Sequence, residues 1–487
     1  MLFTTIEFHL FFLIVGTLFY VLGYYKKHRS AILLLTLASL FFYSFWNIKF
    51  LPLLMGSIGF NLAFGWLLNK FTSNQVLRRC CAVVAVSGNL AFLGFFKYAN
   101  WLISSFDSLG GNISLLNVVL PLGISFYTFT QIAFIVDAYR GKTQDLDPMR
   151  YILFVTYFPH LIAGPILHHR EMMTQFESKR LSKFNHLHIR EGFILFAIGF
   201  MKKILIADTL AGVVSKYYDT GLTLDFWSAW ISSLAYTFQL YFDFSGYTDM
   251  AIGLSLMLNI RLPINFNSPF KARSISDFWR RWHITLSRFL RAYIYIPLGG
   301  NRLGVRRQYL AILTTFILGG IWHGAGGHFV IWGFLNGLGI VIERAWRRKF
   351  PPKNNWIEWM MTFLFVHTTL IFFRANNVGD ALRVLNGMLD FKSILIFGSA
   401  QVPTLDIAWI GSQLDWLWFL PTQLAANLPF AFLIVIAGAI AFFGKNSQDI
   451  ATSSTATRVV PLVLIGYFLA LGWSITKSEQ IFLYFNF

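Results

Sequence analysis

The stretch FHLFFLIVGTLFYVLGYYKKHR, residues 8–29, decides the class of fold. Residues 8–25 are almost entirely apolar, and a run of about 18 such residues can cross the ~30 Å hydrocarbon core of a bilayer. The basic residues KKHR follow directly, as is typical of the cytoplasmic side of a membrane. No small-residue cleavage site followed by soluble sequence comes next, so we expect a retained span rather than a signal peptide. This topology places the N-terminus outside and residues 26–29 in the cytoplasm.

The composition of the chain agrees with a membrane protein. Its 487 residues are 56% hydrophobic and 13% charged, whereas soluble domains carry about 25% charged residues. The formal net charge is +18, and the basic residues are concentrated between the apolar runs. The positive-inside rule explains that distribution without a nucleic-acid partner. The two cysteines, Cys80 and Cys81, are neighbours and predict neither a disulfide framework nor a metal site. We therefore exclude a soluble protein.

The other apolar runs predict an all-α polytopic membrane protein with a single integral membrane domain over 1–487. Further spans are expected near 31–47, 49–71, 81–102, 117–138, 192–214, 226–258, within 309–342, and near 356–373, 429–444 and 459–475. These runs predict about eleven transmembrane helices. The segment 393–420 is apolar but is interrupted by Pro403 and Asp406, which is typical of an external helix or a partial span.

The segment YILFVTYFPHLIAGPILHHR, residues 151–170, predicts a re-entrant piece. Basic residues flank it at both ends, so a straight span would place one basic end outside. Pro159, Gly164 and Pro165 interrupt it, and non-helical backbone is tolerated at membrane depth only where protein or a cavity satisfies it. His160 lies between these helix breakers. It is either structural or part of a tunnel wall that contacts a substrate.

The basic stretch between Arg261 and Gln308 predicts an interfacial helix. On a helical wheel, the large apolar side chains from Phe278 to Tyr293 share about one third of the circumference, and arginines lie opposite. The arginines would meet either anionic lipid headgroups or the phosphates of a donor such as a coenzyme A, because guanidinium groups bind phosphate bidentately. His283 lies at the edge of the aromatic face. The candidates for donor binding in this stretch are Arg280, Arg281 and Trp282.

The segment GGIWHGAGGH, residues 319–328, places His323 between two apolar runs at membrane depth. Ionisable groups are costly there and mark functional sites, and imidazole can accept a proton near neutral pH. The neighbouring glycines allow close helix approach or the non-helical backbone of a cavity wall. The alternative is a histidine hydrogen-bonded between helices. Trp322, directly before it, is a further candidate for donor binding.

Polar residues also interrupt the span near 226–258. Asp243 and Asp249 are six residues apart and lie on different faces of a straight helix, which argues against an acid–base dyad. Buried polar side chains in lipid more often bind neighbouring helices. No nucleotide-binding loop, GxSxG elbow or HExxH motif appears, so we expect no bound metal or cofactor.

Six segments together resemble the membrane-bound O-acyltransferase superfamily. They are FYTFTQIAFIVDAYRG (126–141), FPHLIAGPI (158–166), YFDFSGYTDMAIGLSLMLNIRLPINFNSPF (241–270), SISDFWRRWHITLSRFLRAYIYIPLGGNR (274–302), GGIWHGAG (319–326) and FLYFNF (482–487). They look most similar to its bacterial branch, the membrane subunits for O-acetylation of alginate and peptidoglycan. The resemblance implies tilted helices around a thin centre that is pierced by a tunnel. Its core motifs would cover about 120–345, with C-terminal helices over 356–487.

The resemblance also implies roles for two histidines. His323 falls on the family's catalytic histidine, and His283 falls on its second active-site position. The donor would be acetyl-CoA or another acyl thioester, docked at the basic cytoplasmic face, with His323 as general base. A periplasmic SGNH-type acetyltransferase would pass the acetyl group to an envelope polysaccharide, which makes the chain an inner-membrane protein with both termini periplasmic.

If the resemblance is set aside, the residues are also consistent with two other functions. A transporter or flippase would use the same intramembrane histidines as a path for protons or substrate and would form no acyl bond. A scaffold for a glycan-export complex would need no catalytic histidine. The motifs also leave open whether the acceptor is peptidoglycan, alginate or another exopolysaccharide.

Overall fold

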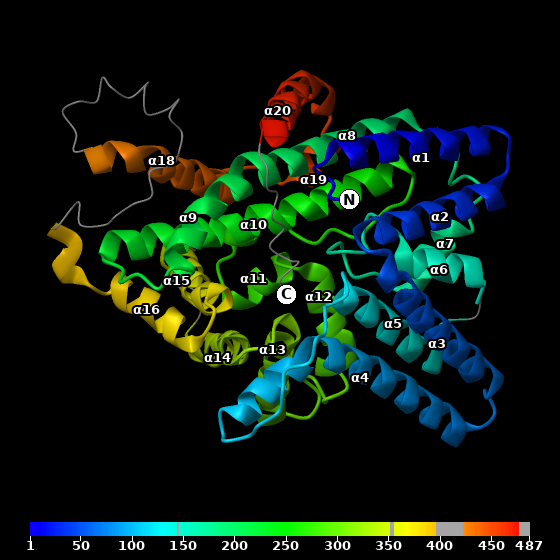
Figure 1. Ribbon diagram of the computed structural model, residues 1–487, viewed down its shortest axis with the longest axis horizontal. Coiled ribbons are helices and arrows are strands. Elements are labelled where there is room, and N and C mark those ends of the chain that lie inside the picture. Colours follow the sequence, from blue (N-terminus) through cyan, green and yellow to red (C-terminus); the bar gives the residue numbers. More distant parts are fainter. Residues whose placement is uncertain (144–145, 351–354, 396–421, 477–487) are drawn as a thin grey trace.

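The computed structural model of the chain describes residues 1–143, 146–350, 355–395 and 422–476. This part of the chain consists of helices and connecting segments, with no β-strand among the described residues. The expectation of an all-α membrane protein is therefore confirmed. Figure 1 shows two short helices, α11 and α12 (Ile275–Arg281 and Ile284–Leu290), near the middle of the molecule, with longer helices around them.

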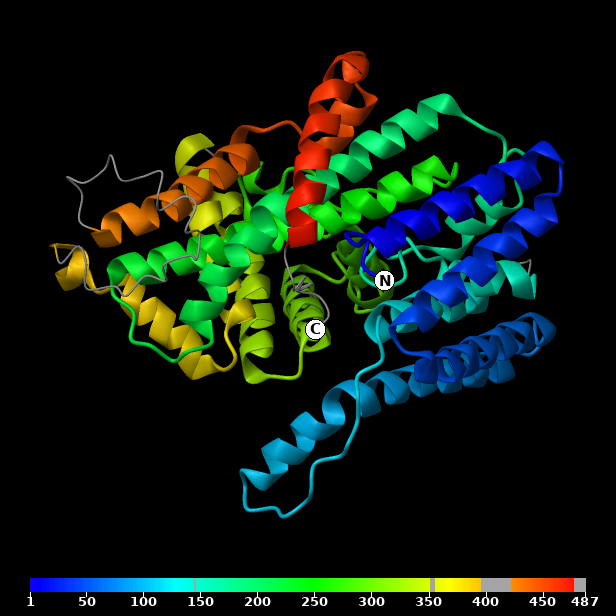
Figure 2. The same cartoon turned by 45° about the horizontal axis from the view of Figure 1, so that its top comes forward.

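The first third of the chain forms α1 (Ile6–Tyr24), α2 (His28–Trp46), α3 (Leu51–Lys70), α4 (Gln75–Asp107), α5 (Ile124–Tyr139), α6 (Pro148–Thr156) and α7 (His169–Phe176). The middle forms α8 (His186–Met201), a π-helical turn η2 (Lys202–Ala207), α9 (Asp208–Tyr218) and α10 (Phe226–Met257). Figure 2 shows that the end of α4 and the chain leading to α5 project away from the rest of the molecule.

The last part of the chain forms α13 (Val305–His323), α14 (Gly327–Lys349), α15 (Asn355–Arg374), α16 (Val378–Met388), α18 (Thr422–Phe443), α19 (Ser447–Thr452) and α20 (Ala456–Thr476). Seven helices of the described ranges are long and apolar enough to cross a membrane, namely α1, α2, α3 with its preceding turn, α4, α14, α15 and α20. Helices also lie within the other predicted spans, at α5, α8 with α9, α10, α13 and α18, but residues 117–123 before α5 are not helical. Most of the segment 393–420 and the terminal FLYFNF lie outside the described residues.

The predicted interfacial helix between Phe278 and Tyr293 is not continuous. It is divided into α11, α12 and a π-helical turn η4 (Arg291–Tyr295), and the break falls at Trp282–His283. The cause is a set of long-range hydrogen bonds: the backbone N–H of Ile284 donates to the carbonyl of Asn265, at 3.0 Å, and thereby draws the chain away from the helical path. The expectation of one straight helix with His283 at its edge is therefore wrong.

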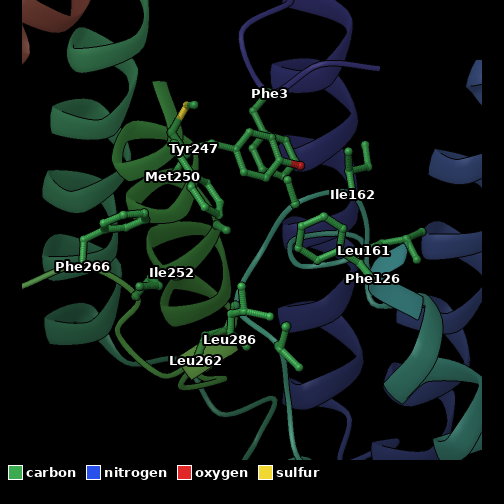
Figure 3. Close-up of a cluster of buried hydrophobic side chains, with 14 of the residues drawn as sticks. Phe3, Phe126, Leu161, Ile162, Tyr247, Met250, Ile252, Leu262, Phe266 and Leu286 are labelled. Atoms are coloured by element: carbon green, nitrogen blue, oxygen red, sulfur yellow. The ribbon is translucent and has the colours of Figure 1, made fainter. Parts of the chain in front are cut away.

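The expected break in 151–170 is confirmed, because α6 ends at Thr156 and α7 begins at His169. The irregular segment between them is buried in the interior. Figure 3 shows its residues Leu161 and Ile162 in one apolar cluster with side chains of α5, α10 and α12. The start of the chain closes the same cluster, where the rings of Phe3 and Tyr247 stack at 4.7 Å. This core supports the backbone around the break at His283.

The acidic residues of α10 bind neighbouring helices. Asp243 pairs with Lys203 at 2.6 Å, and Asp249 pairs with Lys202 at 2.7 Å. The hydroxyl of Ser447, at the start of α19, also donates to Asp249, at 2.7 Å. Because the two lysines are consecutive residues of the π-helical turn η2, both can reach α10. The structure thus confirms that these aspartates join helices rather than form an acid–base dyad.

Candidate active site

His323 is the last residue of α13 and is 5% exposed. Aromatic rings surround its imidazole: the ring centroid of Trp332 lies at 5.1 Å and that of Phe373 at 5.0 Å, both edge-on. Close packing of α13 and α14 brings Trp332 to His323, because Gly320 faces Gly333 and a Cβ atom on Gly320 would collide with the carbonyl oxygen of Phe329. Glycine and aromatic residues together therefore build a close-packed aromatic wall around the imidazole.

The end of α13 is held from another helix. The side chain of Lys97, in α4, donates to the carbonyl oxygens of Trp322 at 2.5 Å and His323 at 3.0 Å. The hydroxyl of the next residue, Tyr98, donates to the carbonyl of Ile321 at 2.7 Å. The three last carbonyls of α13 are thus bound by two consecutive residues of α4. Helix ends leave such carbonyls without intrahelical partners.

His283 lies at the break between α11 and α12 and is 1% exposed. Its backbone has φ 43° and ψ 54°, in the left-handed region that a non-glycine residue seldom adopts. Its Nδ1 atom lies 3.2 Å from Oδ1 of Asn265, an oxygen that also accepts the backbone N–H of Thr285 at 3.1 Å. Such strained backbone persists only where its surroundings fix it, and it is common at active sites.

These contacts determine the tautomer of His283. The backbone N–H of Thr285 can only donate, so the amide atom that it meets must be the oxygen of Asn265. An amide oxygen only accepts, so Nδ1 of His283 carries the proton. In the neutral ring Nε2 is then the basic nitrogen. No described residue supplies a hydrogen-bond partner for this buried Nε2 atom.

The two histidines come from separate segments but share one region. His283 and Lys97 both lie near enough to His323 to interact with it electrostatically. The indole of Trp332, next to His323, also touches the indole of Trp279, in α11, at 5.7 Å. The structure thus brings together the two histidines that the sequence singles out. The indole N–H groups of Trp322 and Trp332 are buried and have no acceptor among the described residues.

A cavity of about 510 Å³ lies beside this region. Four arginines line it, namely Arg280, Arg291, Arg302 and Arg344. Its other walls contain polar side chains and an apolar part that includes Trp279, Leu290 and Phe316. Trp279 connects it to Trp332 and so to His323, and Leu290 lies against Gly319, one turn before His323. The cavity combines a cationic surface with an apolar wall that leads towards the histidines.

The predicted donor-binding residues occupy different places. Arg280 lines the cavity, and Trp322 stacks on Phe129 at 4.9 Å beside His323. Arg281 instead pairs with Asp277 at 2.9 Å and does not line the cavity. The ring of Trp282 stacks on Phe278 at 5.5 Å within the aromatic core. The Nε2 atom of His160 lies 2.9 Å from the carbonyl oxygen of Phe154, at the end of α6.

Sequence reasoning missed several residues of this site. Lys97 interrupts the apolar run FLGFFKYANWL (92–102), and a charged residue at membrane depth is a signal that could have found it. Arg302 and Arg344 are not in one helix with Arg280, so no helical wheel relates them. Asn265 gives no local signal, because its contact with His283 depends on the tertiary fold.

Comparison with known proteins shows which family the chain belongs to. The model of the membrane-bound O-acyltransferase family matches residues 21–378. A peptidoglycan O-acetyltransferase of Helicobacter pylori is 40% identical, over 100% of this chain and 98% of its own length. A probable alginate O-acetylase of Pseudomonas putida is also 40% identical, over 80% of this chain and 82% of its own.

A more distant relative is a teichoic acid D-alanyltransferase of Bacillus subtilis, which is 29% identical over 51% of this chain and 67% of its own length. The family match includes α11, α12, α13 and α14, and therefore both histidines and the arginine-lined cavity. The chain is thus a multi-pass membrane protein and an acyltransferase that belongs to the membrane-bound O-acyltransferase family.

Proposed function

We propose that this enzyme transfers an acetyl group from a cytoplasmic thioester donor, acetyl-CoA, for O-acetylation of a cell-envelope polysaccharide. The names of the two relatives at 40% identity support the acetyl group and the class of acceptor. The observation that carries the proposal is the convergence of His283 and His323 beside a cavity lined by four arginines.

The cavity suits a phosphate-bearing thioester. Its volume of about 510 Å³ lies within the ~300–1,000 Å³ usual for small-molecule sites. Arg280, Arg291 and the other two arginines would bind the phosphates through paired N–H groups. The apolar wall of Trp279 and Leu290 would hold the uncharged arm of the donor, with its thioester directed towards His323.

The chemistry would be general-base acyl transfer. His323 takes the proton from the acceptor hydroxyl while the hydroxyl oxygen attacks the thioester carbonyl carbon. The tetrahedral oxyanion collapses, the C–S bond breaks, and the leaving thiolate takes the proton back from His323. The products are an acetyl ester and free CoA, with His323 neutral again. A positioned base of this kind contributes ~10²–10⁴-fold to the rate.

The indole groups beside His323 would stabilise the oxyanion. The N–H groups of Trp322 and Trp332 are buried donors without an acceptor among the described residues. Donors fixed in a water-poor site stabilise developing negative charge strongly, because they do not reorganise during the reaction. His283, with Nε2 as an acceptor, would orient the donor or the hydroxyl rather than stabilise the oxyanion. This assignment follows from its tautomer.

The expected setting completes the proposal. The chain would lie in the inner membrane with both termini periplasmic, and the arginine-lined cavity would face the cytoplasm, where the basic loops predict it. The acetyl group would leave on the opposite side. There a periplasmic SGNH-type protein would carry it to the polysaccharide, which is peptidoglycan or alginate by the names of the relatives.

Covalent chemistry separates this proposal from a transporter. The purified protein in proteoliposomes is given acetyl-CoA labelled in the acetyl group, together with an SGNH-type acetyltransferase and soluble peptidoglycan fragments or alginate oligosaccharides. We expect labelled ester and an equal amount of free CoA, made faster than in protein-free liposomes. Intact labelled acetyl-CoA inside the liposomes, without free CoA, would instead show transport and contradict the proposal.

A further inference from the structure

Lys97 is a charged residue in the middle of an apolar helix. It lies in α4 within the run FLGFFKYANWL, and α4 is one of the helices long and apolar enough to cross a membrane. A lysine there is costly unless its ammonium group is fully hydrogen-bonded. The contacts of Lys97 therefore indicate what offsets that cost.

The ammonium group of Lys97 has three hydrogen-bond acceptors. They are the carbonyl oxygens of Trp322 at 2.5 Å and His323 at 3.0 Å, and the hydroxyl of Ser125, in α5, at 3.4 Å. An ammonium group has three N–H donors, so each has an acceptor. The ring of Trp322 lies 5.7 Å from the same nitrogen and adds a cation–π contact.

The place of these acceptors matters because α13 ends at His323. The C-terminus of a helix carries a partial negative charge from carbonyls without intrahelical partners, and a cation there is stabilising. Gly324 follows in an extended conformation, so the chain itself does not continue the helix. Lys97 thus supplies from α4 the cap that the sequence of α13 lacks.

Aromatic rings of neighbouring helices contact the side chains of Trp322 and His323. Phe126 and Phe129, both in α5, contact the indole of Trp322 at 5.9 and 4.9 Å. Trp332 and Phe373 contact the imidazole of His323. The backbone that carries these two side chains is bound by Lys97 alone among the cations of the described chain.

We propose that Lys97 is a positioning residue, which fixes the last turn of α13 and thereby holds His323 in the orientation that its role as base requires. This inference rests on the proposed function, because it assigns Lys97 to the same reaction. Lys97 does not transfer a proton in it, since each of its N–H groups already has a protein acceptor. Its effect on the reaction passes through the backbone of His323.

The experiment compares four single substitutions in the full-length protein in nanodiscs. Lys97→Met removes the charge and all donors, Lys97→Gln removes the charge but keeps two donors, and Lys97→Arg keeps both. Tyr98→Phe is the matched control, because it removes one neutral hydrogen bond to the same helix end, at Ile321. Each protein is measured for acetyl transfer and for hydrogen exchange of a peptide that covers residues 319–328.

We expect Lys97→Met to lower kcat by about 10–100-fold, the loss caused by a misplacement of ~1 Å, with KM for acetyl-CoA little changed. Hydrogen exchange in 319–328 should rise, because the last turn frays. Lys97→Arg should restore most of kcat, and Tyr98→Phe should have the smaller effect on both measurements. If Lys97→Met does not fold, Lys97→Gln is used instead. We expect it to show a smaller loss of kcat than Lys97→Met would and a raised hydrogen exchange in 319–328.

Each other outcome overturns the inference. Raised exchange with unchanged kcat would make Lys97 a structural cap only. Lost kcat with unchanged exchange would place Lys97 in the chemistry itself. Unchanged values of both would show that the contact does nothing. The proposed function is tested separately, by measuring acetyl transfer in His323→Ala. Wild-type transfer in that variant would refute the role of His323 as base, whatever the hydrogen exchange of the Lys97 variants.

Discussion

The Nδ1 atom of His283 donates to Oδ1 of Asn265 across 3.2 Å, and the same oxygen accepts the backbone N–H of Thr285. The hydroxyl of Thr285 donates to it as well, at 2.9 Å, and accepts the N–H of Ile166 at 3.0 Å. The side-chain amide of Asn265 and the hydroxyl of Thr285 therefore connect three segments that are distant in sequence. This arrangement explains both the left-handed backbone of His283 and the tautomer that leaves its Nε2 atom as an acceptor.

Replacement of Asn265 tests the role of that tautomer. Asn265→Ala removes the acceptor and leaves buried N–H groups unsatisfied, at a cost of about 1–3 kcal/mol for each group. We expect a large loss of kcat in Asn265→Ala and a smaller one in Asn265→Asp, which keeps an oxygen at that position. The nitrogen NMR shifts of His283 should show Nδ1 protonated in the wild type and in Asn265→Asp. Wild-type kcat in Asn265→Ala would contradict the role.

Trp332→Phe tests the oxyanion donors. Phenylalanine keeps an aromatic ring against His323 but removes the indole N–H. Loss of one such donor typically costs about 10²–10³-fold in kcat, and we expect a loss of that order with little change in KM. The matched control is Trp359→Phe, whose indole N–H is already bound to the backbone carbonyl of Phe270 at 2.8 Å and which does not line the cavity. An equal loss in both variants would indicate a packing effect instead.

The arginines that line the cavity are predicted to bind the phosphates of the donor. Arg302→Ala should raise KM for acetyl-CoA about 10–100-fold, because a hydrogen bond to a charged group contributes about 1.5–3 kcal/mol, and should leave kcat nearly unchanged. Arg306→Ala is the control, since Arg306 is exposed and does not line the cavity. Steady-state kinetics should be repeated with S-acetyl pantetheine, which lacks the phosphates. The same rise in KM for both donors would exclude phosphate binding by Arg302.

Two adjacent glycines offer a test of the packing around His323. A Cβ atom on Gly320 would collide with the carbonyl oxygen of Phe329, whereas one on Gly319 would meet only Leu290, at an ordinary 3.4 Å. Overpacking costs ~1–3 kcal/mol, so Gly320→Ala should lower both the melting temperature and kcat. Gly319→Ala should be close to wild type in both measurements. Equal effects of the two substitutions would show that the contact between α13 and α14 does not hold His323.

The sequence could predict those features that depend on local pattern. Apolar runs of membrane length located the helices, and Pro159, Gly164 and Pro165 located the break between α6 and α7. The polar environment of Asp243 and Asp249 was also predictable, because a charge inside a span must find a partner in a neighbouring helix. His323 stood out because it is a titratable residue among glycines at membrane depth.

Features that depend on long-range contacts were not predictable from one sequence. A helical wheel assumed that 278–293 is straight, and it could not show that Asn265 captures the chain at Ile284 and turns His283 inward. The cavity collects Arg280 from α11, Arg302 from the segment before α13, and Arg344 from α14. Lys97 carried a signal of its own, a charge in an apolar run, but its acceptors at the end of α13 are more than 200 residues away in sequence.

The role of His323 as the base for acyl transfer can be measured by comparing two histidine variants with the wild type. Single-turnover release of CoA from acetyl-CoA is measured, with acceptor present, for wild type, His323→Ala and His328→Ala, each checked for an unchanged melting temperature. His328 is the matched control, a buried histidine five residues further on, in the first turn of α14. We predict that His323→Ala loses ~10²–10⁴-fold in rate, the contribution of a general base, while His328→Ala stays near wild type. A wild-type rate in folded His323→Ala would show that His323 is not the base.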